Sequence, residues 1–384
     1  MSDFFVTMSD DAFWRFVMVS ALVISIVAAG ILIPQILLIA FRKKLFDELD
    51  ERKIHHSTVP RLGGMAFEPV ILFTIFILLV VDIHTGRLQL MEELGENILS
   101  LSICVCSLIL LYLVGIADDL IGVRYSAKFV VQVGCGLLFL FGGLYISDLH
   151  GLFFFNSLPW FLFWPMTVLL VVFIINAMNL IDGIDGLASG LSGVALGYYG
   201  FVFFEIGEYT FSLVAFATLG TVIPFFYYNV FGEAEKQKKI FMGDTGSLTI
   251  GLILCFLSFR MANVEISPTH TCLSKVHPMF LAFTPLMVPC MDVVRVFIFR
   301  LKCRKNPFMP DKSHIHHKLL SLGLSQHVAM ISILFFSAFI IVISLILSKE
   351  MNPTLLFMCI VAFFAIINIW MHAKIEEKKA KANG

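Results

Sequence analysis

Apolar stretches of about twenty residues recur along nearly the whole of this sequence, and they restrict its fold more than any other feature. A helix of about 20 residues crosses a hydrocarbon core roughly 30 Å thick. Hydrophobic residues make up 59% of the chain, charged residues 14%, and the mean hydropathy is +0.91. These values are typical of a chain that lives in lipid. We therefore expect an all-α, polytopic integral membrane protein.

About eleven stretches are long enough to span a membrane. The predicted spans are 15–41, 63–83, 97–117, 128–147, 159–178, 187–205, 209–230, 247–263, 277–299, 326–347 and 353–372. Because no soluble domain, linker or repeat interrupts them, we interpret residues 1–384 as one integral membrane domain. The first stretch lacks a basic n-region and is too long for a signal sequence, so we expect it to be retained.

Most of the 27 Lys and Arg residues fall in alternate connections between these spans. The positive-inside rule then places the N-terminus outside and the C-terminus in the cytoplasm. The eight cysteines lie mostly inside the spans and contain no CxxC pair, so we expect neither a disulfide framework nor a zinc site.

Polar side chains collect at helix ends, all in the positively charged connections. Asp118 and Asp119 end the third predicted helix. Two adjacent carboxylates either handle a proton, because one raises the pKa of the other, or jointly hold a cation. Lys128 opens the fourth predicted helix near headgroup depth, where a lysine is either a snorkelling anchor or a ligand. This distribution favours a site at one membrane surface rather than at the midplane.

The segment 176–188, NAMNLIDGIDGLA, follows directly on a long apolar run. A carboxylate at the end of a membrane-length helix is costly unless it binds something, so we expect a functional site here. Each step of three residues leaves about 60° of rotation on an α-helix, so polar residues repeated at that spacing cannot all line one site. Gly183 and Gly186 allow the backbone to bend and bring the later carboxylates round. The repeated polar residues are Asn176, Asn179, Asp182 and Asp185.

Asp244 lies between two glycines in the segment FMGDTGS. Glycine permits close approach of the backbone, and the N–H groups of a helix N-terminus attract phosphate. Thr245 and Ser247 are candidate N-caps of the eighth predicted helix. A carboxylate in this turn suits Mg²⁺, which prefers oxygen ligands and keeps substrate phosphates as partners. Phe241 is either a stacking surface for a flat base or a packing residue.

Three histidines follow the ninth predicted helix, in the sequence PDKSHIHHKL. We expect a short helix after the proline, with Asp311 or Ser313 as its cap. Because they are three residues apart, His314 and His317 should share a face of that helix, and His316 should point elsewhere. No cysteine or carboxylate completes a zinc-binding set, so hydrogen bonds to phosphate or sugar are favoured.

The chain resembles the polyprenyl-phosphate N-acetylhexosamine-1-phosphate transferase family (the MraY/WecA superfamily), specifically its WecA-type branch. The resemblance covers nearly the whole chain. It rests on five motifs in the family's order: RKIHHSTVPRLGG, GIADD, NAMNLIDGIDGLA, FMGDTGSLTIG and PDKSHIHHKL. The MraY branch carries a HHHxE-like run where this chain has HIHHK, which argues against the muramoyl-pentapeptide donor.

The resemblance implies an enzyme that transfers a sugar phosphate within the membrane. A polyprenyl phosphate attacks the β-phosphorus of a UDP-N-acetylhexosamine, UMP leaves, and the polyprenyl-pyrophosphoryl sugar initiates cell-envelope polysaccharide such as the O antigen of lipopolysaccharide. One phosphoanhydride replaces another, so no ATP is needed and catalysis is mainly positioning and charge neutralisation. We expect UDP-GlcNAc as the donor, and GalNAc and deoxy derivatives stay open.

The resemblance also implies roles for particular residues. Asn179 and Asp244 would bind Mg²⁺, for which Mn²⁺ would substitute. Lys128 would hold the lipid phosphate near Asp118 and Asp119, and whether an Asp removes a proton or only organises the site stays open. Phe241 and Asp182 would face uridine. The full set expected to bind substrate is Asn176, Asp182, Asp185, Phe241, Arg300, Arg304, His314, His316 and His317.

The expected partners are UDP-N-acetylhexosamine, undecaprenyl or another polyprenyl phosphate, and the lipid bilayer, with no nucleic acid; a homodimer is left open. The expected location is the inner (cytoplasmic) membrane, with the active site on its cytoplasmic face. A transporter is the alternative function, and it would require polar midplane residues. Candidates are Glu68, Asp292 and Arg295, although the last two are spaced to pair with each other. A non-catalytic scaffold is disfavoured because every motif carboxylate is present.

Overall fold

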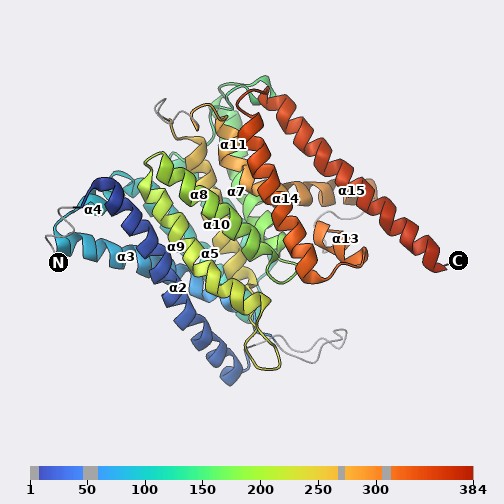
Figure 1. Ribbon diagram of the computed structural model, residues 1–384, viewed down its shortest axis with the longest axis horizontal. Coiled ribbons are helices and arrows are strands. Elements are labelled where there is room, and N and C mark those ends of the chain that lie inside the picture. Colours follow the sequence, from blue (N-terminus) through green and yellow to red (C-terminus); the bar gives the residue numbers. More distant parts are fainter. Residues whose placement is uncertain (1–7, 46–58, 267–272, 305–312, 384) are drawn as a thin grey trace.

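The computed structural model describes residues 8–45, 59–266, 273–304 and 313–383, and over these ranges it is a bundle of helices without a β-sheet (Figure 1). The predicted all-α class is confirmed. The α-helices are α2 Asp10–Lys43, α3 Phe67–Thr85, α4 Gln89–Glu96, α5 Ile98–Ile121, α6 Tyr125–Phe141, α7 Trp160–Ile181, α8 Leu187–Glu205, α9 Tyr209–Val230, α10 Gly243–Ala262, α11 Pro278–Phe283, α12 Met287–Lys302, α13 Ile315–Ser321, α14 Gln326–Leu347 and α15 Pro353–Asn383. Short 3₁₀ turns are η1 Gly63–Ala66, η2 Leu152–Phe154 and η3 Thr284–Leu286.

Ten helices in the described ranges are long and apolar enough to cross a membrane, one fewer than predicted. The stretch predicted over 128–147 is α6, which begins at Tyr125 and has only 17 residues. Gly142 and Gly143 follow it, the latter in the left-handed region at φ +72°, and the next residues form a loop. At 1.5 Å per residue α6 is about 25 Å long, shorter than the hydrocarbon core. The polytopic membrane character is confirmed, while the orientation of the termini stays a prediction.

For two of the spans that differ from their predicted bounds, the reason is local. The first begins at Asp10 rather than residue 15, because the Ser9 side chain accepts a hydrogen bond from Ala12 N and caps the helix. The ninth, predicted as one stretch over 277–299, is divided into α11, η3 and α12. Pro285 lies inside η3 and lacks the N–H that a continuous helix would need.

Among the described spans, α10 is the most deeply buried: 94% of its most apolar 18-residue stretch lies inside the protein. Figure 1 shows it in the middle of the bundle. Its first turn packs backbone to backbone against η1 and α5: a Cβ at Gly64 would overlap the Gly246 backbone, and a Cβ at Gly115 would lie 2.5 Å from Thr245 Cα. Small residues allow such close approach between membrane helices. These glycines bring the motifs RKIHHSTVPRLGG, GIADD and FMGDTGSLTIG into contact.

We predict that Gly115→Ala lowers the stability of the protein by about 1 to 3 kcal/mol, because the added methyl would overlap the α10 backbone. Thermal unfolding in detergent measures the loss. Gly134→Ala in α6 is the matched control, since a Cβ there has nothing within 4 Å. Equal unfolding temperatures for the two variants would refute the close packing.

Candidate active site

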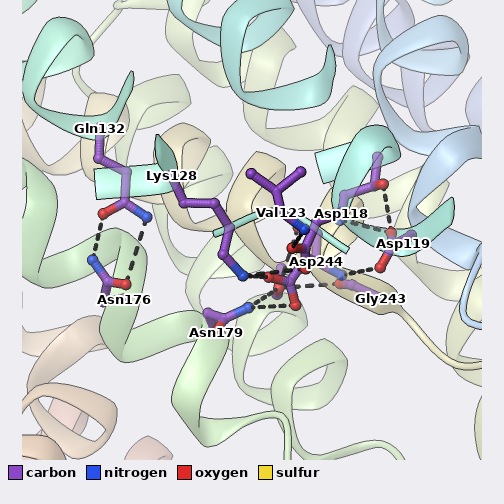
Figure 2. Close-up of polar contacts among 11 residues, drawn as sticks. Asp118, Asp119, Val123, Lys128, Gln132, Asn176, Asn179, Gly243 and Asp244 are labelled. Carbon is purple, nitrogen blue, oxygen red and sulfur yellow. Dashed lines mark hydrogen bonds and ion pairs between the residues drawn. The ribbon is translucent and has the colours of Figure 1, made fainter. Parts of the chain in front are cut away.

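Four helix ends converge on a group of carboxylates. We call Asp118, Asp119 and Asp244 the acid cluster; each offers an oxygen within 4.8 Å of the others. The first two residues end α5, and Asp244 lies in the first turn of α10. Lys128, in the first turn of α6, and Asn179, near the end of α7, point toward them (Figure 2). The structure thus brings together five predicted site residues.

Lys128 joins two members of the acid cluster. Its Nζ lies 2.6 Å from Asp244 Oδ2 and 3.1 Å from Asp118 Oδ2. Asn179 Nδ2 donates to Asp244 Oδ1 at 3.2 Å and to Ser247 Oγ at 2.8 Å. The Lys128 ammonium therefore binds two carboxylates at once, one from α5 and one from α10. This placement favours the ligand interpretation of Lys128 over a simple membrane anchor.

Asp119 has a different position from its neighbour, because it caps α10. Its Oδ1 accepts from Asp244 N at 2.8 Å, and its Oδ2 accepts from Thr245 N at 3.0 Å and from Thr245 Oγ1 at 2.6 Å. The prediction that Thr245 or Ser247 caps this helix is wrong, because α10 begins earlier, at Gly243. A carboxylate from α5 satisfies the exposed N–H groups instead. Asp119 thereby fixes the position of Asp244.

The four polar residues of 176–188 separate, as their spacing predicted. Asn176 Nδ2 donates to Gln132 Oε1 at 2.6 Å and to Val172 O at 2.7 Å, and Figure 2 shows this pair apart from the acid cluster. Asn176 therefore links α7 to α6, and the structure does not bring it to the acid cluster, unlike Asn179. Gln132 was not singled out from the sequence, although a glutamine inside an apolar helix is a signal of such a pair.

Beyond Ile181 the chain turns, and the two later carboxylates follow it. Gly186 adopts the left-handed conformation at φ +77°. Asp185 Oδ2 lies 2.5 Å from Lys239 Nζ, which ties this turn to the loop before α10. Burial raises the pKa of Asp182 to about 7, and the negative charges of Asp185 and Asp244 add to the rise. Asp182 is therefore near enough to Asp244 for their negative charges to interact.

Asn229, at the end of α9, makes hydrogen bonds to two loops, the turn after α7 and the segment before α10. Its Nδ2 donates to Ile240 O at 2.9 Å, and its Oδ1 accepts from Gly186 N at 2.6 Å. Sequence reasoning missed this residue. Its signal was an asparagine at the end of an apolar helix, where a buried amide needs partners on both sides.

Phe241 lies just before α10, on a segment that pairs with the 59–64 motif. Its N donates to Pro60 O, and its O accepts from Gly63 N, both at 2.9 Å. The residue is only partly buried, and the choice between a stacking surface and a packing residue stays open. Residues 52–58 of the first motif lie outside the described residues.

The histidine helix α13 begins at Ile315, so His314 precedes it, and the prediction that His314 and His317 share a helical face is wrong. The predicted cap Asp311 lies outside the described residues, and the N-cap position is held by His314 rather than by the predicted Ser313. The buried Asp292 of α12 serves instead: its Oδ2 lies 2.8 Å from His314 Nδ1, and its Oδ1 accepts from Ile315 N at 3.1 Å. The predicted pairing with Arg295 is confirmed at 2.7 Å.

His316 packs against the turn after α7. Its ring occupies the space that a Cβ at Gly183 would need, and it stacks on His314 with the ring centroids 5.7 Å apart. The side chain is buried, and neither ring nitrogen has a hydrogen-bond partner among the described residues. Burial lowers the pKa of His316 to about 3, with His317 adding to the fall, so the imidazole is neutral. The third motif, NAMNLIDGIDGLA, therefore touches the last, PDKSHIHHKL.

The remaining predicted cations lie at the end of α12. Arg300 is buried in its last turn, and Arg304 is exposed just beyond the helix, with a positive φ of 54°. His317 follows His316 in α13, and the centroids of the two rings are 4.3 Å apart. Residues 305–312, which connect α12 to the histidine helix in the sequence, lie outside the described ranges.

A large apolar groove lies beside the histidine helix. It encloses about 1000 Å³ between α7, α12 and α15. Its apolar walls include Leu170, Phe173, Val294 and Phe364, and Ile174 in its lining is five residues before Asn179. Three lysines also line it: Lys302, Lys318 and Lys379. The groove therefore combines a wall fit for hydrocarbon with cationic side chains.

Comparison with known proteins agrees with this arrangement. The family model of Glycosyl transferase family 4 matches residues 101–262. A probable undecaprenyl-phosphate N-acetylglucosaminyl 1-phosphate transferase of Bacillus subtilis is 31% identical over 365 residues, which covers 93% of this chain and 91% of that protein. The chain belongs to the polyprenyl-phosphate N-acetylhexosamine-1-phosphate transferase family.

Two further relatives of this transferase are named undecaprenyl-phosphate alpha-N-acetylglucosaminyl 1-phosphate transferase. The protein of Yersinia pestis is 28% identical over 314 residues, which covers 80% of this chain and 78% of that one. The protein of Escherichia coli is 29% identical over 302 residues, which covers 77% of this chain and 74% of that one. The family resemblance read from the five motifs is confirmed.

The lowered pKa of His316 predicts a pH dependence of stability. The unfolded imidazole takes up a proton near pH 6.5, whereas the folded one stays neutral down to about 3. Because the unfolded state then binds more protons, stability is full above about pH 6.5 and falls as the pH drops. His316→Gln should therefore reduce the fall in unfolding temperature between about pH 7 and 5. The exposed His327→Gln should leave that fall unchanged; identical slopes in both variants would refute the assignment.

Proposed function

We propose that this transferase moves N-acetylglucosamine 1-phosphate from UDP-N-acetylglucosamine to undecaprenyl phosphate and releases UMP. The names of its relatives support this reaction. The observation that carries it is the convergence of the acid cluster and Lys128 with the histidine helix, next to an apolar groove. A charged, water-soluble donor and a lipid acceptor can meet only where such surfaces adjoin.

The groove supports a lipid acceptor. A polyprenyl chain would lie along the apolar walls of α7, α12 and α15, where each buried CH₂ group contributes about 0.8 kcal/mol. Its phosphate would reach Lys128 at the start of α6, beside Asp118. The positive-inside rule places this side of the bundle in the cytoplasm, so we assign the reaction to the cytoplasmic face of the inner membrane.

The acceptor needs no general base. A phosphate monoester has a second pKa of about 6, so it is mostly dianionic at neutral pH. One of its oxygens forms a bond to the β-phosphorus of the donor, and the bond from that phosphorus to the bridging oxygen breaks as its electron pair leaves with UMP. Asp119 is engaged with the N-terminus of α10. We therefore propose that Asp118 and Asp119 organise the site.

The residues of the acid cluster also fit Mg²⁺, which favours carboxylate and carbonyl oxygens and binds through one or two carboxylates plus substrate phosphates. Asp244 would hold it together with Asn179, whose Oδ1 stays available while Nδ2 donates to Asp244. When bound, the ion would neutralise charge on the donor diphosphate. Lys128, already in contact with Asp118 and Asp244, would supply the second positive charge.

The donor would lie between the histidine helix and Phe241. The two ring nitrogens of His316 have no hydrogen-bond partner in the part of the chain that the structure describes, and the His317 ring lies against it. Neutral imidazoles can donate or accept, which suits sugar hydroxyls and phosphate oxygens. Phe241, three residues before Asp244, and Asp182, whose pKa is raised in part by the charge of Asp244, would face the uridine.

Purified protein supplied with undecaprenyl phosphate, UDP-GlcNAc and Mg²⁺ should release UMP, and EDTA should abolish the release. Asp244→Asn should lower the rate by at least about a hundredfold, because the metal loses its carboxylate, while the unfolding temperature stays within a few degrees. Asp11→Asn, an exposed pair with Arg15 at the start of α2, should be as active as wild type. UMP release that survives excess EDTA would refute the metal assignment, and no release from any UDP-sugar would refute the reaction.

Lys128 and His317 should act on different substrates. Lys128→Ala should raise KM for undecaprenyl phosphate about tenfold or more, because a charge-assisted contact is lost, and change KM for UDP-GlcNAc much less. His317→Ala should do the reverse. Steady-state kinetics in detergent, with each substrate varied in turn, measure both values. Equal effects of both variants on both substrates would show that this division is wrong.

A further inference from the structure

The last helix, α15, runs along one side of the bundle (Figure 1) and is held near its two ends. Its residues from Phe357 to Lys379 contribute to the lining of the apolar groove. At its first turn, Thr354 Oγ1 accepts from Phe153 N at 2.7 Å, and the Phe153 and Phe357 rings pack edge to face. Near its other end, Lys378 Nζ donates to Leu322 O at 3.3 Å, directly after α13. The helix thus spans from the loop before α7 to the histidine helix.

Asn368 is a buried amide in the middle of this apolar helix. Asn368 is only 4% exposed, whereas the neighbouring Ile366 and Ile369 are 63% and 69% exposed. Nδ2 donates to Phe364 O at 3.0 Å, and Oδ1 accepts from Lys318 Nζ at 3.1 Å. A polar group at this depth is costly unless it binds something. Its bond outside α15 goes to the histidine helix.

The histidine helix needs such outside contacts. It has seven residues, and a helix this short is not stable on its own. At its start, Asp292 of α12 accepts from Ile315 N and contacts His314. In its last turn, the Lys318 ammonium donates to Asn368, at 3.1 Å to Oδ1 and 3.4 Å to the backbone oxygen. His316 and His317 lie between these two attachments.

We propose that Asn368 is a positioning residue for the donor side of the site: through Lys318 it fixes the histidine helix from a membrane-spanning helix outside the acid cluster. The proposal rests on the function proposed above. The amide suits this role because it accepts from the ammonium while its own N–H is satisfied within α15. The groove lining includes Asn368, so its alternative role is as a wall for the lipid. Kinetics separate these two roles.

Asn368→Leu keeps the size of the side chain and removes the acceptor. We expect it to lower kcat/KM for UDP-GlcNAc about tenfold and to change KM for undecaprenyl phosphate less than about twofold. Asn368→Asp keeps an acceptor for Lys318 and should stay within about twofold of wild type for both substrates. Ile366→Ala, a lipid-facing change two residues away, is the control and should be neutral.

Lys318→Met tests the same contact from the other helix, and it serves where Asn368→Leu fails to fold. It should produce the same donor-specific loss, and the double variant should be no worse than either single one. A rise in KM for the lipid with unchanged donor kinetics would overturn the proposal, because Asn368 would then be a groove wall. Single effects that add in the double variant would overturn it too.

Hydrogen exchange distinguishes this proposal from the reaction itself. Asn368→Leu should speed amide exchange over residues 314–322, whereas Asn368→Asp and Ile366→Ala should not. That measurement needs no substrate, so it holds even where wild-type protein releases no UMP and the proposed function fails. Unchanged exchange in Asn368→Leu would overturn the positioning role, whatever the activity.

Discussion

The site depends on one interaction: the capping of α10 by a carboxylate from α5. Asp119 accepts from two backbone N–H groups at the start of α10, where the backbone of η1 also approaches at Gly64. In a membrane protein an unsatisfied N–H costs several kcal/mol, so this cap strongly fixes where the helix begins. Asp244 lies in that first turn. Its contacts to Lys128 and Asn179 from two other helices follow from this placement.

Hydropathy predicted the spans well where the bilayer alone sets their length. The helices α8, α9 and α14 have the predicted bounds 187–205, 209–230 and 326–347. It failed at α6, because an apolar run does not reveal that Gly143 adopts a positive φ and ends the helix early. The two consecutive glycines after Phe141, rather than the hydropathy, indicate where α6 ends.

The site shows the same boundary between local and distant causes. The acid cluster, Lys128 and Asn179 were predictable, because costly polar groups at helix ends in one set of loops must share a purpose. The caps were not, since Thr245 and Ser313 looked suitable by position while the actual acceptors, Asp119 and Asp292, come from other helices. Sequence spacing describes neighbours on one helix and is silent on partners supplied by packing.

The use of carboxylates as caps also bears on the charge at the site. Two helices that carry motifs, α10 and α13, each begin against a carboxylate of a neighbouring span, and the one that caps α13, Asp292, is also paired with Arg295. Among the described residues, the ion pairs of the acid cluster given by the structure are those of Lys128 with Asp118 and Asp244, so within this group three carboxylates meet one ammonium and carry two net negative charges. That excess matches one divalent cation and would repel a diphosphate without it. A cluster neutralised by a second lysine would attract a divalent cation less strongly, so the charge imbalance supports the proposed dependence on Mg²⁺.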